Sequence, residues 1–425
     1  MKFKHLLTST FLLISSLIFG QTASQNLTSN WLLLNPDIQM ESNDAINDLY
    51  NFKFDKAEAQ FYKIKKQYPH HPLAYFLIGL SEYWKIVPDD DVETYDKKFH
   101  AYMDSAVMYA EDLHKEDKSN KEAVFFLAAA NGFKGKIYSL RDNYGKAAWV
   151  AKDALNYFEF EEQDNELSPE FKFGAGLYNY FREWIPEEKS WLKMLVFPFK
   201  HGDKEKGIRQ LNEVALNAFY TRTEAYYYLL EIYMYFEPQH LEKKFHEGDV
   251  TKEDYDHKKS KYYIEALKTA KFLHESYPDN SYFEKSYAKL CYLGSHLQPM
   301  EKTSIDIVDK CNKNYFGYTD LDKRYAAYFL GEYFMNHLAQ YDKAEHYYKE
   351  CIEVCEKRKI YYGYYIYTLE KLAKINEMKH NYDAAIEYCN KIIKHVNKKN
   401  SNEKQTLESA KAMIPVLKKL KKAGL

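Results

Sequence analysis

The sequence predicts an almost all-α protein, and its composition carries that prediction. Among 425 residues there are only 15 Gly and 11 Pro, the residues on which most tight turns depend. There are 41 Tyr and 26 Phe, and apolar residues make up 46% of the chain, which is enough for a buried core. Few turn residues and many large rings suit long helices joined by short turns better than a sandwich of many short strands.

The charges are nearly balanced, and this argues against two broad classes of protein. The chain has 60 basic and 62 acidic side chains, so its net charge is −2. A disordered chain usually has a high net charge and few apolar residues, and a nucleic-acid binder usually has a basic excess. We therefore expect a folded chain with no nucleic-acid partner.

Residues 1–20 are predicted to be a signal peptide rather than part of the fold. Lys2 and Lys4 precede an apolar run from Leu6 to Phe19. This run is shorter than the roughly 20 residues of a membrane span but fits the apolar region of a signal peptide. An uncleaved amphipathic or buried helix is the alternative. Because the first cysteine is Cys291, we expect an exported chain, periplasmic or secreted, that is not a lipoprotein.

Residues 21–400 carry a repeated pattern that predicts helical hairpins. An aromatic residue, then Asp or Gly, then Lys or Ala, then Ala, occurs at Phe54–Ala57, Tyr144–Ala147, Tyr341–Ala344 and Tyr382–Ala385. Apolar or small residues return four and seven positions after each of these alanines, which is one stripe of a helix with 3.6 residues per turn. Each pattern therefore predicts the start of an amphipathic helix, the second helix of a hairpin.

These hairpins resemble the tetratricopeptide repeat, whose first helix reads Trp-x2-Leu-Gly-x2-Tyr and whose second reads Ala-x3-Phe-x2-Ala before Pro. The segments that match best are Tyr75–Gly79, Ala57–Ile64 with Pro69, Tyr287–Cys291, Ala266–Leu273 with Pro278, and Leu369–Asn376. The resemblance implies a right-handed α-solenoid of about eight hairpins with insertions.

The series of hairpins is marked by a small residue in each predicted second helix, where the two helices of a repeat cross closely. These residues are Ala57, Ala106, Ala147, Gly207, Ala266, Ser304, Ala344 and Ala385. Their spacing runs from 38 residues, between Ala266 and Ser304, to 60 residues, between Ala147 and Gly207. Since the repeat of the family is about 34 residues long, we expect lengthened or interrupted repeats.

The segment Gly202-Asp203-x3-Gly207-Ile208-x2-Leu211 carries a second, local resemblance. It is similar to part of a eukaryotic tetratricopeptide family linked to the clearance of inclusion bodies at mitochondria. Asp203 is a natural N-cap for the helix that follows, and Gly207 lets two helix backbones approach. We interpret the segment as structural rather than ligand-binding, and we expect Gly207→Ala to be tolerated.

The resemblance also predicts where a partner binds, because the first helices of tetratricopeptide arrays line a concave groove. The aromatic residues that it places there are Phe76, Tyr83, Trp84, Tyr226, Tyr233, Tyr282, Tyr292, Tyr325, Tyr328 and Tyr367, together with Phe125 and Phe133. Rings with a polar tip suit a wet binding surface. The alternative is that these rings fill the wider interior of lengthened helices, and composition does not separate the two.

Four insertions interrupt the repeats, and such insertions map to loops on one face of a solenoid. Val87–Lys98 and Phe158–Glu170 are acidic, Ile185–His201 is apolar, and Glu237–His257 is charged. The carboxylates of the first suggest calcium, and the three histidines of the fourth, His240, His246 and His257, suggest zinc. The spacing of Cys351 and Cys355 suits two ligands of a metal site. No feature has a complete ligand pattern. We therefore interpret the loops as solvated and the thiols as packed, and we predict no metal and no cofactor.

Residues 401–425 are predicted to form a basic capping helix with apolar positions at Leu407, Ala410, Ile414 and Leu417. A solenoid needs a terminal helix with a polar outer face. The basic face of this helix is also a candidate for peripheral contact with an anionic membrane or an acidic partner.

The sequence holds no P-loop, HExxH, GxSxG or dinucleotide-binding glycine pattern, so we predict that the protein is not an enzyme. We predict an exported scaffold that binds a protein or peptide partner in the cell envelope through its concave face. The alternative is a carbohydrate or small-ligand binder that stacks sugars on the same rings, for which loss of glycan binding in Trp84→Ala is the test. The sequence leaves the oligomeric state open.

Overall fold

The computed structural model describes residues 31–162, 168–188, 192–396 and 401–423. Within these ranges every regular element is helical and no strand is present, which confirms the all-α prediction. None of the described helices combines the length and the hydropathy that crossing a membrane requires. The predicted signal peptide lies outside the described residues.

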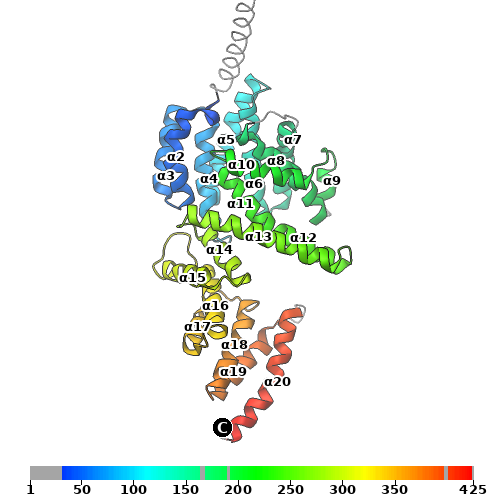
Figure 1. Cartoon of the computed structure of the whole chain (residues 1–425). Helices are drawn as coiled ribbons and strands as arrows, with labels where there is room; N and C mark the ends of the chain where they lie inside the picture. The colour runs from blue at the N-terminus through cyan, green and yellow to red at the C-terminus, as the bar shows by residue number, and fades with distance from the viewer. Residues whose placement is uncertain (1–30, 163–167, 189–191, 397–400, 424–425) are drawn as a thin grey trace, which may run out of the picture. The chain divides into compact units, whose positions relative to one another are not determined.

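The chain divides into two compact units (Figure 1). Unit 1 comprises the chain up to residue 86 and residues 90–249, and unit 2 comprises residues 87–89 and 250–425. Each unit is a run of helices in which neighbours along the chain pack against one another.

Unit 1 holds four successive hairpins, α2 with α3, α4 with α5, α6 with α7, and α8 with α10. Its elements are η1 (Leu32–Leu34), α2 (Pro36–Tyr50), α3 (Phe54–Gln67), α4 (Pro72–Ile86), α5 (Asp96–Glu116), α6 (Lys121–Leu140), α7 (Tyr144–Glu162), α8 (Pro169–Glu188), α9 (Lys193–Val196), α10 (Lys204–Asn217), α11 (Arg222–Glu231), the π-helical turn η3 (Ile232–Phe236) and α12 (Glu237–Glu247).

Unit 2 holds three hairpins, α14 with α15, α16 with α17, and α18 with α19, with α13 packed on α14 and α20 packed on α19. Its helices are α13 (Lys252–Ser276), α14 (Ser281–Leu293), α15 (Leu297–Asn312), α16 (Asp320–Asn336), α17 (Tyr341–Lys357), α18 (Tyr364–Met378), α19 (Tyr382–His395) and α20 (Ser401–Ala423).

Several helices begin where a short polar side chain caps their first free N–H groups. The Asn35 side chain accepts hydrogen bonds from Asp37 N and Ile38 N before α2, and Asp203 Oδ1 accepts one from Lys206 N before α10. Thr319 forms a reciprocal capping box with Asp322 at α16. Such caps satisfy donors that have no partner inside the helix, and the predicted N-cap at Asp203 is confirmed.

The small residues that mark the series are all buried, and all except Ala266 lie in the second helix of a described hairpin. They are Ala57 in α3, Ala106 in α5, Ala147 in α7, Gly207 in α10, Ala266 in α13, Ser304 in α15, Ala344 in α17 and Ala385 in α19. A small side chain at these positions lets the helix backbones approach. The packing therefore confirms the predicted α-solenoid of consecutive helical hairpins.

The crossing of α8 and α10 is closer than a Cβ atom allows, which corrects the expectation for Gly207→Ala. A Cβ atom built on Gly207 would lie 2.7 Å from both Gly176 O and Tyr180 N. Both of these are backbone atoms, so no side-chain rotation relieves the overlap. Gly207 is required by the close approach of two backbones.

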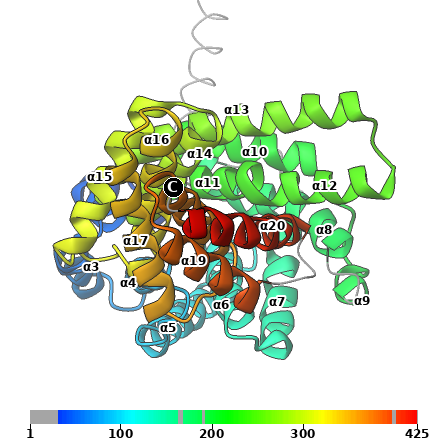
Figure 2. The same cartoon turned by 90° about the horizontal axis from the view of Figure 1, so that it is seen from below.

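Helix α20 packs against α19 and α18 (Figures 1 and 2). Leu407, Ala410 and Leu417 are buried and Ile414 is half-buried, so the apolar stripe of the sequence is the packed face. Lys404, Lys411, Lys418 and other lysines of the helix are exposed on its outer side, as a terminal helix requires.

The insertions are largely ordered by contacts with their own unit. Arg141 on α6 pairs with Asp96 of the acidic insertion (2.7 Å) and donates to Val92 O (2.9 Å). The apolar insertion contains α9, and the charged insertion is mostly α12. Part of the insertion at residues 158–170 lies outside the described residues.

Candidate partner-binding surface

The predicted groove residues of unit 1 are core residues. Phe76, Tyr83, Trp84 and Tyr233 are at most 8% exposed, and only Tyr226 is half-buried among those that were assigned to the groove in this unit. Phe125 and Phe133 are buried as well. In unit 1 the alternative interpretation, rings that fill the interior, therefore describes these side chains.

The burial arises because α11 packs on the first helices of unit 1. Trp84 Nε1 on α4 and Tyr50 OH on α2 both donate to Glu224 Oε1 on α11, at 2.7 and 2.9 Å. The Trp84 and Tyr227 rings lie 5.2 Å apart, nearly edge to face. A helix that is packed on all sides carries apolar residues all round, which is what α4 shows.

One carboxyl at this contact is fully enclosed. Burial raises the pKa of Glu224 above its ordinary value, although the hydrogen bonds from Trp84 and Tyr50 oppose the shift. Its Oε2 atom has no hydrogen-bond partner within the described part of the chain. A protonated Glu224 avoids the cost of a buried charge.

Glu224 is expected to make the stability of the protein fall as the pH rises. The folded chain holds this proton to a higher pH than the unfolded chain, so ionisation disfavours folding as the pH rises above the ordinary range of a carboxyl group. We expect Glu224→Gln to gain stability relative to the wild type between pH 5 and pH 8. Urea unfolding at several pH values measures this difference, and a difference that stays constant over the range contradicts the assignment.

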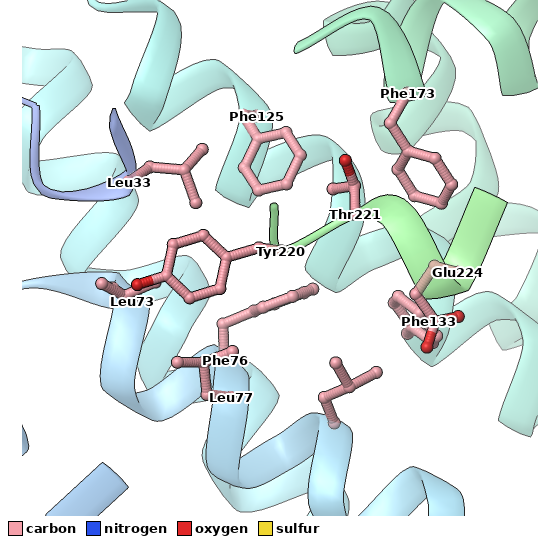
Figure 3. Close-up of a pocket in the computed structure, with 11 residues that line it drawn as sticks. Leu33, Leu73, Phe76, Leu77, Phe125, Phe133, Phe173, Tyr220, Thr221 and Glu224 are labelled. Carbon is pink, nitrogen blue, oxygen red and sulfur yellow. The ribbon is translucent and has the colours of Figure 1, made fainter. Parts of the chain in front are cut away.

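A small cavity adjoins Glu224 (Figure 3). Its wall is mainly apolar: Leu33, Leu73, Phe76, Leu77, Leu80, Phe125, Phe133 and Phe173, with Tyr220, Thr221 and Glu224. Its volume of about 10 Å³ is near the minimum that holds one water molecule. The cavity is therefore a feature of core packing and has no room for a sugar or a peptide side chain.

Lys136 of α6 lies within a cage of tyrosine rings beside this contact. Its Nζ donates to Tyr227 OH (2.8 Å) and lies 4.5 to 5.3 Å from the ring centroids of Tyr83, Tyr227 and Tyr228. Burial lowers the pKa of Lys136, and the charges of Glu231 and Glu224 oppose the shift. Cation–π contacts of this kind hold a lysine that has lost much of its water. These contacts of Lys136 link α6 to α11.

Unit 2 keeps the predicted groove tyrosines at its surface. Tyr282 and Tyr292 on α14, Tyr325 on α16 and Tyr367 on α18 are half-buried, and Tyr328 on α16 is buried. All five lie on first helices of hairpins, as predicted. Four of the five are therefore partly accessible, and whether they bind a partner stays a prediction.

Four tyrosines of three first helices form one group, here called the tyrosine cluster: Tyr292, Tyr325, Tyr328 and Tyr364. The ring centroids of Tyr292 and Tyr328 lie 6.3 Å apart, those of Tyr328 and Tyr364 4.5 Å, and those of Tyr364 and Tyr325 5.2 Å. Tyr328 is the buried member, and the other three are half-buried. The cluster gives adjoining helices a shared aromatic surface.

Charged groups near the cluster are mostly neutralised by pairing. Glu332 on α16 accepts from Tyr348 OH (2.5 Å) and pairs with Lys371 of α18 (2.9 Å). The guanidinium of Arg324 lies 4.7 Å from the Tyr325 centroid and 5.9 Å from the Tyr364 centroid. Glu332 and Arg324 are both buried, at 8% and 7% exposed, so these charged groups belong to the core contacts of the cluster and do not form an exposed polar rim.

Tyr364 and Arg324 were not assigned to the surface by sequence reasoning. Tyr364 stands in a run with Tyr361, Tyr362 and Tyr365, in which the members must point several ways around a helix. Its position as the first residue of α18 distinguishes it from the other tyrosines of the run. Nothing in the sequence marks Arg324.

The residues considered for zinc do not converge on one site. His240 pairs with Glu188 (2.7 Å) and His246 pairs with Glu242 of its own helix (3.2 Å). Cys351 and Cys355 are buried in α17, and Thr368 Oγ1 donates to Cys351 Sγ (3.5 Å). Among the described residues no group of histidine, cysteine and acidic side chains is arranged to hold a metal ion.

No protein-family model and no curated protein matches the sequence. Among solved structures, the chain is similar to yeast Tom70, with 14% identity over 90% of each chain and a TM-score of 0.31. It is also similar to a circular tandem repeat protein with novel repeat topology, with 10% identity, coverage of 90% of this chain and 94% of the other, and a TM-score of 0.26. Scores this low do not carry function from either protein, so the assignment of hairpins rests on the helices described above.

Proposed function

We propose that the protein is an exported, non-catalytic scaffold that binds a protein or peptide partner in the cell envelope, and that the partner docks on the tyrosine cluster. The observation that carries the proposal is the group of half-buried rings shared by α14, α16 and α18. Tyrosine contributes contact area at a low cost in conformational entropy, because only two torsions are immobilised. The sequence pattern of residues 1–20 supports export.

The orientation of the rings favours a polypeptide over a sugar. Sugar stacking needs two or three coplanar exposed rings, but the Tyr325 and Tyr364 planes meet at 86° and the Tyr328 and Tyr364 planes at 54°. Trp84, the ring expected to serve as a sugar platform, is 0% exposed. Rings 4.5 and 5.2 Å apart at such angles are in contact with one another and offer no shared flat platform for a sugar.

Replacement of Tyr325 by alanine is expected to weaken partner binding by about 2 kcal/mol or more, the loss typical of a central aromatic residue of an interface. The partner would first be captured in the source cell with a photo-crosslinking amino acid at position 325, and its affinity then measured by calorimetry. Tyr362→Ala is the matched control, because Tyr362 is 64% exposed and lies outside the cluster.

Three outcomes would contradict the proposal. Crosslinking at position 325 without any protease-sensitive adduct would exclude a polypeptide partner. Equal losses of affinity in Tyr325→Ala and Tyr362→Ala would exclude the cluster as the docking site. Fractionation that finds the full-length chain in the cytoplasm would remove export and the envelope.

A further inference from the structure

The most exposed large apolar side chains of unit 1 gather on two elements that pack against each other. Met194 (87% exposed) and Phe197 (83%) belong to α9 and its C-terminal end, and Trp149 (71%) belongs to α7. Helices α7 and α9 are in contact, and α9 lies at the edge of unit 1 (Figures 1 and 2). Elsewhere in unit 1, Met40 on α2 is 73% exposed and Leu216 on α10 is 65% exposed.

Lysines flank the apolar side chains on both elements. On α7, Lys146 and Lys152 stand three residues before and after Trp149, on the same exposed face. Around α9, Lys193 and Lys200 are exposed on either side of Met194 and Phe197. A long lysine side chain can lay its stem on apolar material while its ammonium group stays in water.

The carboxylates at the end of α8 make contacts with groups other than these four lysines. Glu187 pairs with Lys204 (3.0 Å), and Glu188 pairs with His240 (2.7 Å). Glu183 lies 3.2 Å from His201. Within residues 192–200 the charged side chains are Lys193 and Lys200, and both are exposed.

We propose that this α7–α9 corner docks on an anionic lipid bilayer, with Met194, Phe197 and Trp149 in the interface and the lysines at the lipid phosphates. Rings and thioethers that project between exposed lysines fit the boundary between headgroups and acyl chains. Each lysine near an anionic bilayer contributes attraction. Three projecting side chains are too few for a standard protein interface of about 800 Å² per partner. The inference is independent of the tyrosine cluster.

The test places an environment-sensitive fluorophore at the tip. Phe197→Cys in the full chain, labelled with NBD, is mixed with vesicles of phosphatidylcholine and phosphatidylglycerol at a ratio of 7:3. A blue shift and a rise in NBD emission are expected, and both should be smaller with phosphatidylcholine alone. The readout is local to position 197, so binding through residues 1–20 does not produce it. Unsubstituted protein treated in the same way gives the background from its own thiols, of which Cys311 is the half-buried one.

Met40→Cys is the matched control, because Met40 is exposed to a similar extent but has no lysine beside it. Met40 lies beside Glu41 and near Asp37 and Asp44 on α2, so the label there should not respond to the anionic vesicles. Lys146→Gln and Lys152→Gln should each weaken vesicle binding about fivefold, since one lysine contributes about 1 kcal/mol at such a surface. Lys418→Gln and Lys419→Gln on α20 should leave the signal at position 197 unchanged.

Three results would overturn the proposal. The first is an NBD signal at position 197 that does not respond to anionic vesicles. The second is an equal response at positions 197 and 40. The third is a response at position 197 to poly-glutamate without lipid and none to vesicles, which would assign the corner to an acidic protein partner instead.

Discussion

Gly207→Ala is expected to lower the free energy of unfolding by about 1–3 kcal/mol, the usual cost of overpacking a close contact. The added Cβ atom would lie 2.7 Å from Gly176 O and Tyr180 N. The two helices α8 and α10 must separate to accept it, which loosens the contact of Gly176 with Leu211 as well. Alanine is favoured over glycine in a helix by up to about 1 kcal/mol, and this gain is too small to compensate. Urea unfolding followed by circular dichroism measures the change.

Gly145→Ala is the control for helix propensity. Gly145 lies in the first turn of α7, and a Cβ atom there meets no atom within 4 Å. Its substitution should leave the stability unchanged or raise it. Equal stabilities of Gly207→Ala and the wild type would show that α8 and α10 do not cross as closely as described.

Trp84→Ala is expected to cost about 3–5 kcal/mol, the range for removing a fully buried tryptophan. The side chain is 0% exposed and contacts the rings of Tyr50, Tyr83 and Tyr227. Its removal leaves a cavity and deprives Glu224 of a hydrogen-bond donor. The loss would appear in urea unfolding as a lower midpoint with native-like secondary structure below the transition.

Trp149→Ala is the matched control, because Trp149 is 71% exposed and should change the stability by less than about 0.5 kcal/mol. A small loss in Trp84→Ala, similar to that of Trp149→Ala, would contradict the packing of α11 on α4. A large loss also means that glycan binding in Trp84→Ala cannot separate a sugar binder from a scaffold, since the variant alters the core of unit 1.

The sequence by itself determined the helical hairpins of this protein. Helix formation and hairpin packing leave a local signal, because a stripe with a period of 3.6 residues and a small residue at the crossing both fall within one helix. That is why the buried small residues of the series, apart from Ala266 in α13, could be placed in second helices. The N-cap at Asp203 was predictable for the same reason, since its partner N–H lies three residues away.

Only the tertiary structure decided which first helices keep an aromatic surface. Trp84 and Tyr325 both lie in first helices and were both predicted to line the groove, yet Trp84 is enclosed because Glu224 and Tyr227, more than 130 residues further along the chain, pack on it. The space available for a side chain at position 207 likewise depends on the backbone of another helix, α8. Contacts between distant segments leave no periodic signal in a single sequence, so a ring in the core and a ring at a binding surface look alike until the helices are packed.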